Sequence, residues 1–356
     1  MKYYTGKNNT VYYLEDTPIG RGGEGIVYAV SNNPSLVAKL YLPRRLQPED
    51  SRKELQAKIE AMLSYKIKTH IDGVLRVAWA EDALYDNGAF AGYIMPKVTF
   101  PYKIYDVYRN ENRKYTWKSS VQFAYNLSWV VWYLHLNDII IGDMNPNNIA
   151  IGEKGEVALL DCASFDIWDK RTGHHFPCAV GLEELLAPEL QTVGKLTNGS
   201  FTKESDCFSL AIHIFRLLMN NADPFGGKVT GYYTESQSAI PANRAIINGE
   251  SPYFRTIPNK EIPDYAPNRD FLPPDLFAAF DRTFNYTATT AKKSIKNRTT
   301  AEEWTRLLLK YAAPEPNPNL QTCKNDPTHV YPIHHTTCPF CGYQSNSGLR
   351  KGKKHY

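Results

Sequence analysis

A polar loop separates two apolar runs between residues 139 and 151, where the sequence reads IIIGDMNPNNIAI. Both apolar runs are typical of strands, so Asp143 and Asn148 are expected in a loop at strand ends. A turn rich in Asn and Pro would explain part of this composition without any function. The choice between a plain turn and a functional loop therefore depends on what the neighbouring sequence adds.

A second apolar strand, Val157–Leu160, follows after a short hairpin and ends in Asp161. Two carboxylates and a carboxamide at such positions are what Mg²⁺-assisted phosphoryl transfer requires. One carboxylate accepts the proton of the nucleophile, and the other two groups supply the hard oxygen ligands that Mg²⁺ prefers. Asp143, Asn148 and Asp161 therefore predict a phosphoryl-transfer site.

A glycine-rich segment, GRGGEGIV at residues 20–27, fits the pattern G-x-G-x-x-G-x-V. Glycine turns between strands are common and many bind nothing. Here a strand follows the last glycine, whereas a dinucleotide-binding βαβ unit would continue into a helix. A glycine-rich hairpin can lie over phosphates because its backbone N–H groups approach an anion closely. Gly20, Gly22, Gly25 and Val27 are therefore candidate nucleotide-binding residues.

Lys39 lies in the next strand, inside the apolar run Leu36–Leu40. A lysine in an edge strand would simply face solvent. Because the glycine-rich hairpin comes directly before it, its ammonium is instead expected to reach the phosphates. A lysine held there needs a carboxylate partner, and the helix expected from about residue 49 to 64 offers Glu54 and Glu60. The sequence does not choose between these two.

The chain divides into a strand-rich first part and a helix-rich second part, which indicates an α+β fold. Short strands are expected at residues 11–14, 26–30 and 36–40, and near 74–79 and 89–95. Apolar residues take helical spacing from about Trp117 onward. After Leu309, a proline-rich segment at residues 313–320 is expected to form a stiff, extended linker.

The ordered set of motifs resembles the eukaryotic-type protein kinases, with matches from about Gly20 to Trp304. The resemblance implies a Ser/Thr-directed enzyme that uses ATP and Mg²⁺. Asp143 falls at the position of the catalytic base and Asn148 at that of a Mg²⁺-binding Asn. Asp161 matches the aspartate of the D-F-G motif, and Lys39 the strand lysine that holds the phosphates.

The same resemblance implies a bilobal kinase domain over residues 1–312, with an N-lobe at about 1–96 and a C-lobe at about 97–312. Residues 92–96 resemble the hinge between lobes, where adenine binds backbone groups, so Val37 and Met95 are further nucleotide-binding candidates. Later matches belong to the activation segment and the C-lobe: Ala187-Pro188-Glu189, the helix-capping Asp206, and Arg298 as partner of the A-P-E glutamate.

Three positions depart from the kinase pattern. Ile141-Gly142 replaces the His-Arg pair before the catalytic Asp, which predicts activity that does not depend on phosphorylation of the activation loop. Asn145, a candidate catalytic residue, stands where protein kinases usually place a charge-stabilising Lys. Ala163 replaces the glycine of D-F-G. These departures leave two alternatives open: a nucleotide-binding pseudokinase scaffold and a small-molecule phosphotransferase.

The tail carries four soft ligands, Cys323, His329, Cys338 and Cys341, with His334 or His335 as substitutes for His329. Two thiolates in a C-x-x-C spacing chelate one tetrahedral ion, so residues 321–345 are expected to fold around a structural Zn²⁺. A disordered tail with incidental cysteines is the alternative. The module resembles the zinc appendage of bacterial kinases encoded with von Willebrand A-domain and PP2C-type phosphatase partners.

Composition and charge limit the classes of partner and the cellular compartment that the sequence allows. The chain has 356 residues with 41 Lys and Arg against 37 Asp and Glu, a net charge of only +4. This balance disfavours a nucleic-acid or membrane partner, while protein substrates are what the kinase resemblance implies. No secretory signal is apparent at Met1, so a cytoplasmic, reducing compartment is expected and clustered cysteines indicate metal. The basic tail at residues 346–356 is expected to be solvated.

Overall fold

The computed structural model describes residues 2–109, 115–193, 196, 200–230 and 242–344. The predicted basic tail at residues 346–356 lies outside the described residues. The chain folds into two compact units, and each unit combines segments that are distant in the sequence. Unit 1 comprises residues 1–104, 133–182 and 193–206, and unit 2 comprises residues 105–132, 183–192 and 207–356.

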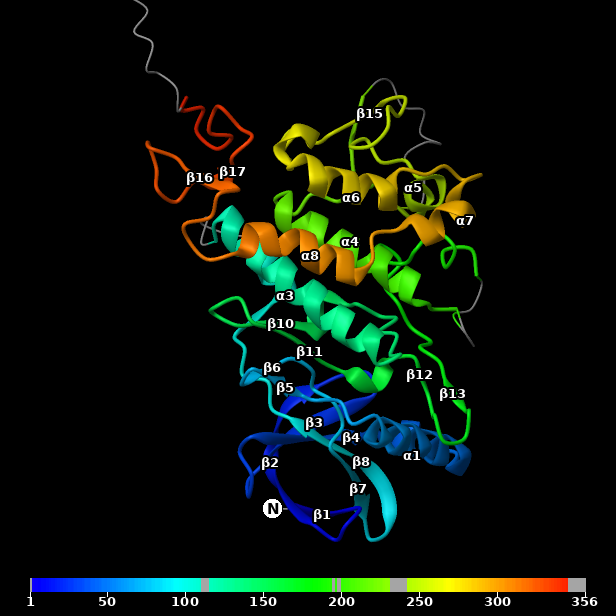
Figure 1. The fold of residues 1–356 in the computed structure, drawn as a ribbon. Helices are drawn as coiled ribbons and strands as arrows, with labels where there is room; N and C mark the ends of the chain where they lie inside the picture. The colour runs from blue at the N-terminus through cyan, green and yellow to red at the C-terminus, as the bar shows by residue number, and fades with distance from the viewer. Residues whose placement is uncertain (1, 110–114, 194–195, 197–199, 231–241, 345–356) are drawn as a thin grey trace, which may run out of the picture. The chain divides into compact units, whose positions relative to one another are not determined.

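Unit 1 begins with a closed barrel of antiparallel strands in the order β1-β2-β3-β4-β8-β7 (Figure 1). Its core is a cluster of buried apolar side chains contributed by every strand: Tyr4, Leu14, Val30, Ala38, Leu84 and Ile94. The strands are β1 Lys2–Gly6, β2 Val11–Arg21, β3 Gly25–Val30, β4 Leu36–Tyr41, β7 Asp82–Asp86 and β8 Ala89–Pro96. The three strands predicted between residues 11 and 40 are confirmed.

Two barrel strands were not predicted: β1 and β7. The strand predicted near residues 74–79 is shorter than expected, because β6 spans only Val74–Leu75, where it pairs with β5 (His70–Ile71). The residues after β6 turn inward instead, and Trp79 is buried with its indole N–H donating to the carbonyl of Met62 at 2.9 Å. Tertiary packing therefore ends this strand early.

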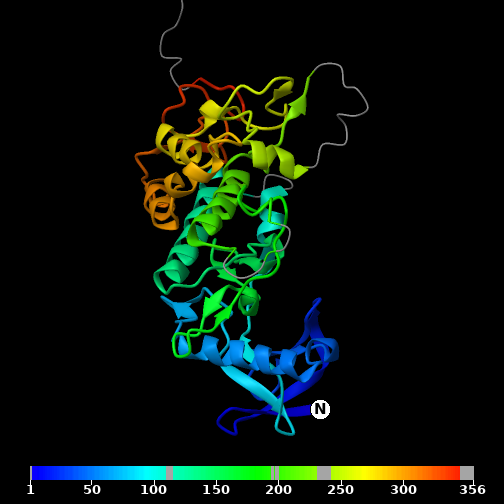
Figure 2. The same ribbon diagram turned by 90° about the vertical axis from the view of Figure 1, so that its right-hand side faces the viewer.

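Helix α1 (Glu49–Ser64) spans the predicted residues and packs against β7, β8 and the 3₁₀ turn η4 (Cys162–Ser164). Figure 2 shows it running along one side of the barrel strands. Ile59, Ala61 and Met62 are its buried residues. Lys53 lies on the opposite face of the helix and is exposed. The predicted helix is confirmed.

Unit 1 continues with a three-stranded sheet, β11-β10-β9, and a hairpin. The sheet strands are β9 Tyr102–Lys103, β10 Ile149–Ile151 and β11 Val157–Leu159, and the hairpin strands are β12 Ile167–Trp168 and β13 His175–Phe176. The loop of residues 139–148 precedes β10, and Asp161 follows β11 by two residues. The predicted strands after the loop and before Asp161 are confirmed as β10 and β11. The strand predicted at residues 139–141 is wrong, because only Ile140 pairs there, in an isolated bridge with Asp166.

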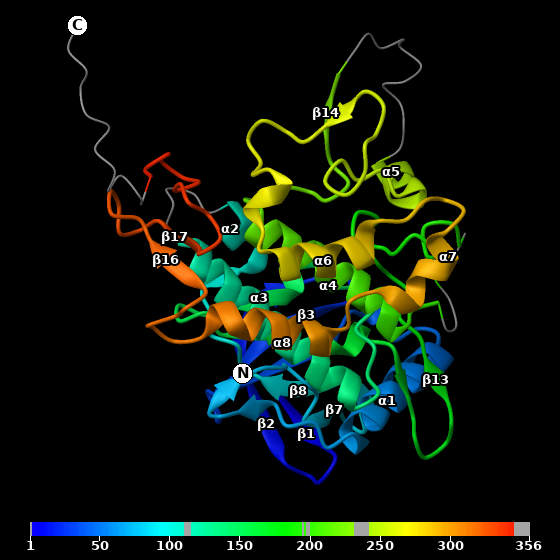
Figure 3. The ribbon, with the colours of Figure 1, turned by 45° about the horizontal axis from the view of Figure 1, so that its top comes forward.

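Unit 2 is built around helices that bury an aromatic core. The ring centroids of Phe215 and Phe280 lie 5.1 Å apart, and those of Phe280 and Trp304 lie 4.6 Å apart. Helices α6 and α8 pack together, as Figure 3 shows. The helices are α2 Ile104–Arg109, α3 Trp117–Leu136, α4 Lys203–Leu218, α5 Ala242–Asn248, α6 Pro274–Phe284, α7 Ala291–Ser294 and α8 Ala301–Ala312.

Unit 2 also contains two small hairpins, β14–β15 and β16–β17. Their strands are β14 Lys228–Val229, β15 Lys260–Glu261, β16 Leu320–Thr322 and β17 Val330–Pro332. Within the described part of the chain, no helix combines the length and the apolar character needed to cross a bilayer.

The segment at residues 313–320 is not the extended linker that its prolines predict. Asn317 is buried, and its side-chain amide donates to the carbonyls of Lys310 and Tyr311, each at 3.1 Å. These carbonyls belong to the last turn of α8, where the helix leaves them without partners. Asn317 therefore folds the segment back onto the end of α8, and one capping side chain outweighs the stiffness of the prolines.

Candidate active site

Lys39 and Asp161 meet in unit 1, where the Lys39 ammonium donates a short hydrogen bond to the Asp161 carboxylate. Lys39 lies in β4 and is 7% exposed. Asp161 adopts a left-handed backbone (φ 52°) directly before the turn η4. That turn is stabilised by Ser164, whose backbone N–H donates to the carbonyl of Asp161 at 2.9 Å.

The partner of Lys39 is therefore Asp161, and neither of the two glutamates considered from the sequence. The Glu54 carboxylate accepts a hydrogen bond from His174 at 2.9 Å. The Glu60 carboxylate accepts one from Gln56 at 3.0 Å. The sequence could not reveal this pairing because the two residues are 122 positions apart and meet only through the fold.

The glycine-rich segment forms the turn between β2 and β3, as predicted. The N–H of Gly22 donates to the carbonyl of Gly25 at 2.9 Å and closes the turn. A Cβ at Gly25 would lie 2.6 Å from the carbonyl oxygen of Leu40 and 3.3 Å from carbons of the Lys39 side chain. Glycine at this position lets the loop backbone approach Lys39 closely.

Strand pairing aligns the other nucleotide-binding candidates with Lys39. Val27 is the register partner of Lys39 between β3 and β4. Val37 is the partner of Met95 between β4 and β8, and both side chains are buried. These residues thus belong to three adjacent strands of the barrel, β3, β4 and β8, and the glycine turn joins β3 to the next strand, β2, within unit 1.

Asp143 lies in the loop before β10, partly buried, and its Oδ1 atom is buried with no hydrogen-bond partner among the described residues. Burial raises the pKa of Asp143, and the nearby Asp161 carboxylate raises it further, while a backbone N–H at Leu182 acts in the opposite direction. A buried carboxylate oxygen without a partner is costly unless a ligand contacts it. This oxygen is therefore available to an acceptor hydroxyl group or a metal ion.

One backbone hydrogen bond holds the metal-ligand candidates Asn148 and Asp161 near each other. The N–H of Leu160, directly before Asp161, donates to the carbonyl of Asn148 at 2.8 Å. Asn148 itself ends the 3₁₀ turn η3 (Pro146–Asn148). Carboxylate and carboxamide oxygens are hard donors that suit Mg²⁺, so the chemistry of this set fits that ion.

Asn145 has a structural partner. Its side-chain oxygen accepts a hydrogen bond from the backbone N–H of Asn147 at 2.9 Å and caps η3. Asx side chains commonly stabilise tight turns in this way. Asn145 therefore shapes the loop that carries Asn148, and the carboxamide brings no positive charge to the position.

Asp206 fixes the backbone that leads into Asp143. Its carboxylate is fully buried and accepts hydrogen bonds from the N–H groups of Ile141, at 2.7 Å, and Gly142, at 2.9 Å. His135 contributes a third contact at 3.0 Å. The bracing role expected for Asp206 from the resemblance matches this geometry, whereas His135 was not predicted. Its signal in the sequence was a histidine within the mostly apolar last turns of helix α3.

Gly142 explains why the arginine of the kinase pattern is missing. Its φ of +75° lies in the left-handed region, and a Cβ there would approach Cβ and Sγ of Cys178 to 2.7 Å. Both the backbone conformation and the neighbouring side chain therefore exclude a larger residue. Cys178 occupies the space beside the loop that a side chain at position 142 would need.

Comparison with known proteins shows the family of this chain. Residues 13–305 match the family model described as the protein kinase domain. The chain belongs to the protein kinase family. The strand-rich and helix-rich parts of the kinase fold, predicted from the motifs, are therefore confirmed.

Curated relatives agree with this assignment. Protein kinase YegI of Escherichia coli strain K12 is 28% identical to the chain over 345 residues, which is 93% of the chain and 48% of the relative. The same protein from Escherichia coli O157:H7 is 28% identical over 344 residues, 93% of the chain and 49% of the relative. This protein kinase thus spans about half the length of the curated relatives it matches.

An ion pair within unit 2 holds Glu189 of the Ala187-Pro188-Glu189 motif in place. The guanidinium of Arg298 donates two parallel hydrogen bonds to the carboxylate of Glu189, each at 2.7 Å. Arg298 is buried, and its guanidinium also lies 5.1 Å from the ring centroid of Phe208. A bidentate pair of this kind fixes orientation as well as charge, as expected for the A-P-E glutamate and its arginine.

The four soft ligands of the tail converge. One ligand atom from each of Cys323, His329, Cys338 and Cys341 lies within 4.8 Å of the others. The Cys323 and Cys341 sulfurs are 3.6 Å apart, and Cys338 Sγ is 3.7 Å from Nδ1 of His329. Tetrahedral Zn²⁺ with Zn–S bonds of ~2.3 Å separates its sulfurs by about 3.8 Å, so the spacing fits that ion.

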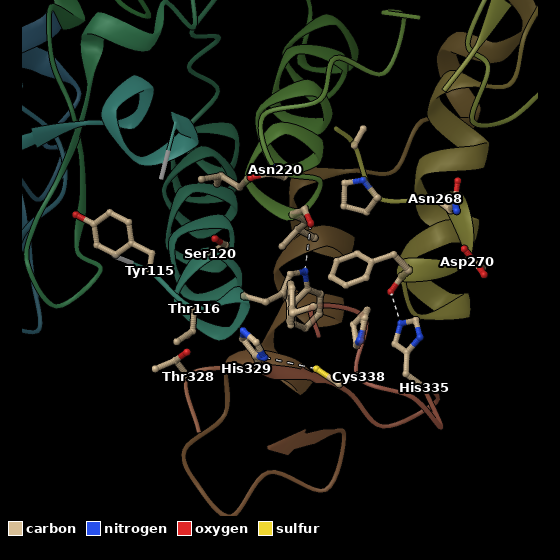
Figure 4. A pocket seen from close by; sticks show the side chains of 18 of the residues that line it. Tyr115, Thr116, Ser120, Asn220, Asn268, Asp270, Thr328, His329, His335 and Cys338 are labelled. Atoms are coloured by element: carbon tan, nitrogen blue, oxygen red, sulfur yellow. Dashed lines mark hydrogen bonds between the residues drawn. The ribbon is translucent and has the colours of Figure 1, made fainter. Parts of the chain in front are cut away.

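The two substitute ligands considered for His329 lie elsewhere. The ring nitrogens Nε2 of His334 and His335 contact the carbonyl oxygens of Asp270 and Phe271, at 3.1 and 3.0 Å. These two contacts attach the tail to the segment before α6. Figure 4 shows His335 turned toward this segment, and His329 and Cys338 toward each other beside a cavity of 610 Å³. His329 is therefore the histidine of the cluster.

Proposed function

We propose that this protein kinase is an ATP- and Mg²⁺-dependent Ser/Thr kinase that transfers the γ-phosphoryl group of ATP to protein hydroxyl groups. The observation that carries the proposal is the convergence of Lys39, Asp161, Asn148 and Asp143 within one compact unit. A cation, two hard metal ligands and a carboxylate with an unpartnered buried oxygen are the groups that phosphoryl transfer needs.

Each residue has one role in the proposed reaction. Lys39 and the glycine turn at residues 20–25 hold the phosphates, while Val37 and Met95 contact the adenine. Asn148 and Asp161 hold Mg²⁺, which neutralises charge on the phosphates when bound. Asp143 accepts the proton of the acceptor hydroxyl as its oxygen attacks the γ-phosphorus, and ADP leaves.

A protein acceptor is favoured by two observations. The relatives are named protein kinases. The Arg298–Glu189 pair also supports this choice, because it anchors the activation segment, on which protein substrates dock, and small-molecule phosphotransferases lack that motif. Pro146, in the loop after Asp143, suits the Ser/Thr-directed form of the motif.

The zinc module is part of the proposal. Cys323, His329, Cys338 and Cys341 would bind one structural Zn²⁺ and order residues 321–344, with no part in catalysis. We further propose that the module docks a protein partner, with von Willebrand A-domain and PP2C-type proteins as the classes to test. The six cysteines, all of which lie in the described part of the chain, form no disulfide, and this suits a cytoplasmic, reducing compartment.

The test compares the wild-type chain with Asp143→Asn in labelled ATP, with and without Mg²⁺, on a generic protein substrate and on small hydroxyl acceptors. We expect label on Ser and Thr of protein, only with Mg²⁺, and at least about 10³-fold less with Asp143→Asn. Tight ATP binding without any transfer would instead identify a pseudokinase scaffold. Label confined to the small acceptors would identify a small-molecule phosphotransferase.

A further inference from the structure

One face of α1 is turned toward the segment that follows Asp161. Glu54, Lys58 and Met62 are spaced four residues apart and therefore share that face. At one end, Glu54 contacts His174 of the β12–β13 connection at 2.9 Å. At the other end, Met62 is fully buried and its carbonyl accepts the Trp79 indole N–H. Lys58 lies between these two contacts, one turn from each.

The ammonium of Lys58 has no hydrogen bond and no ion pair within the described residues. The charged or ionisable groups that act on it are Cys178, Asp166, Glu24 and Asp161. Each carboxylate among them already has a partner: Asp161 has Lys39, Asp166 has His175 at 2.7 Å, and Glu24 has Arg45 at 3.0 Å. Lys58 is thus a partly buried cation surrounded by carboxylates that bind other groups.

These neighbours belong to the elements of the active site. Glu24 lies in the glycine turn, between Gly23 and Gly25, and Asp161 is a candidate metal ligand. Cys178 packs against Gly142, the residue directly before the candidate base Asp143. Helix α1 also packs against η4, the turn that directly follows Asp161. The electrostatic interactions of Lys58 therefore extend to the glycine turn, to the metal position and to the cysteine beside the catalytic loop.

The energetics also favour an anionic ligand at this place. Burial lowers the pKa of Lys58 by more than the neighbouring carboxylates and thiol raise it, so the charged ammonium is less stable here than in water. A phosphoryl oxygen would supply the missing partner through a charge-assisted hydrogen bond. The loop does not already carry such a cation, because Asn145 is neutral and its side-chain oxygen caps η3.

We propose that the ammonium of Lys58 contacts the terminal phosphoryl group of the bound nucleoside triphosphate and stabilises its charge during transfer. Lys58, from helix α1, then supplies the positive charge that a lysine at position 145 would supply from the loop. This assignment rests on the proposed function, since it requires a nucleotide at the site. It makes Lys58 a catalytic residue that the motifs did not indicate.

The test compares Lys58→Met and Lys58→Arg with a matched control, Lys53→Met, which removes an exposed lysine from the same helix. Calorimetry measures binding of ADP and of the β,γ-imido analogue of ATP, and kcat is measured on the protein substrate. We expect Lys58→Met to lower kcat on the order of 100-fold and to weaken analogue binding at least about tenfold, with ADP binding unchanged. Lys58→Arg should recover most of the analogue affinity, and Lys53→Met should match the wild type.

The assignment is overturned if Lys58→Met keeps kcat within about threefold of the wild type. It is also overturned if Lys58→Met loses ADP and analogue binding equally, since Lys58 would then support the fold and not the terminal phosphate. Either result leaves the proposed function intact, provided that the wild type binds ATP and transfers its phosphoryl group. A wild type that binds neither nucleotide overturns both.

Discussion

The buried carboxylate of Asp206 accepts the backbone N–H of Gly142 at 2.9 Å and thereby holds the residue directly before Asp143. The same carboxylate accepts the N–H of Ile141 and contacts His135. Asp206 lies in the first turn of helix α4 and is separated from Gly142 by 64 positions in the sequence. The orientation of the candidate base thus depends on a residue that takes no part in the chemistry.

Replacing Asp206 with Ala should lower the free energy of unfolding by about 3 kcal/mol, because two buried backbone N–H groups lose their acceptor. We expect kcat to fall as well, since the Asp143 backbone loses its support. Asp206→Asn keeps one acceptor oxygen and should have a smaller effect. Urea denaturation and kcat measure both variants, and wild-type stability in Asp206→Ala would contradict the bracing role.

Replacing Gly142 with Ala should destabilise the fold by about 3 kcal/mol, from left-handed strain together with the contact to Cys178. Gly173→Ala is a matched control, because Gly173 has a φ of +74° but nothing within 4 Å of its Cβ. It should carry only the cost of strain, about 1 kcal/mol. Thermal unfolding of the two variants separates the cost of backbone strain from the cost of the contact with Cys178. Equal losses of stability in the two variants would show that Cys178 does not restrict position 142.

Asp143 should titrate at a higher pH than an ordinary aspartate. Its pKa is raised by burial and by Asp161, and a general base works only when it is deprotonated. The acid limb of kcat against pH should therefore lie above the usual aspartate pKa of about 3.9, with activity lost as the pH falls through the raised value. An acid limb at or below that value would contradict the environment seen for Asp143.

The raised pKa of Asp143 also affects the stability of the fold. A carboxyl group whose pKa is raised in the folded state favours folding only in its protonated form, so its ionisation at neutral pH is destabilising. Asp143→Asn should therefore raise the free energy of unfolding at pH 7 by roughly 1 kcal/mol while abolishing transfer. The gain should shrink as the pH falls below the raised pKa, which chemical denaturation at several pH values measures.

The tail should lose its structure without metal. We expect one Zn²⁺ per chain by elemental analysis, and its loss in the double variant Cys338→Ser, Cys341→Ser. His334→Ala is the control, because His334 contacts a backbone carbonyl and lies outside the cluster. Proteolysis should then cut within residues 321–344 only in the double variant, with kcat retained. Full zinc content in the double variant would exclude this cluster as the metal site.

Activity should not require phosphorylation of the activation segment. Two hydroxyl residues lie between Asp161 and Ala187, namely Ser164 and Thr172. Gly142 presents no cation to a phosphate, so a variant with both hydroxyl residues changed to Ala should keep kcat within about tenfold of the wild type. Ser164 contributes a hydrogen bond to the Asp161 carbonyl at 2.8 Å, which accounts for some loss. Abolished transfer in Thr172→Ala alone would refute the prediction.

Local patterns in the sequence were sufficient to predict the helix and the strands near the candidate site. The residues of α1 followed from its apolar spacing, and the glycine turn followed from its pattern between two strands. The strands β1 and β7 were missed because neither alternates strictly between buried and exposed residues: Lys2 and Tyr3 are both exposed in β1, and Ala83 and Leu84 are both buried in β7. Propensity also misjudged residues 313–320, where the buried side chain of Asn317 governs the backbone.

By itself, the sequence determined the inventory of chemical groups: a glycine turn, Lys39, a loop with Asp143 and Asn148, Asp161 after a strand, and four soft ligands in the tail. These follow from short-range patterns, because turns, strand ends and ligand spacings are encoded within a few residues. The family match agrees with that inventory.

Only the tertiary structure decided which of these groups meet. It paired Lys39 with Asp161 instead of a glutamate of α1, and it placed Cys178 where it excludes a side chain at Gly142. It also left Lys58 partly buried, in electrostatic interaction with Asp161 and with Glu24 of the glycine turn. The physical reason is that burial and partner choice depend on contacts between residues far apart in the chain, and no local pattern records such contacts.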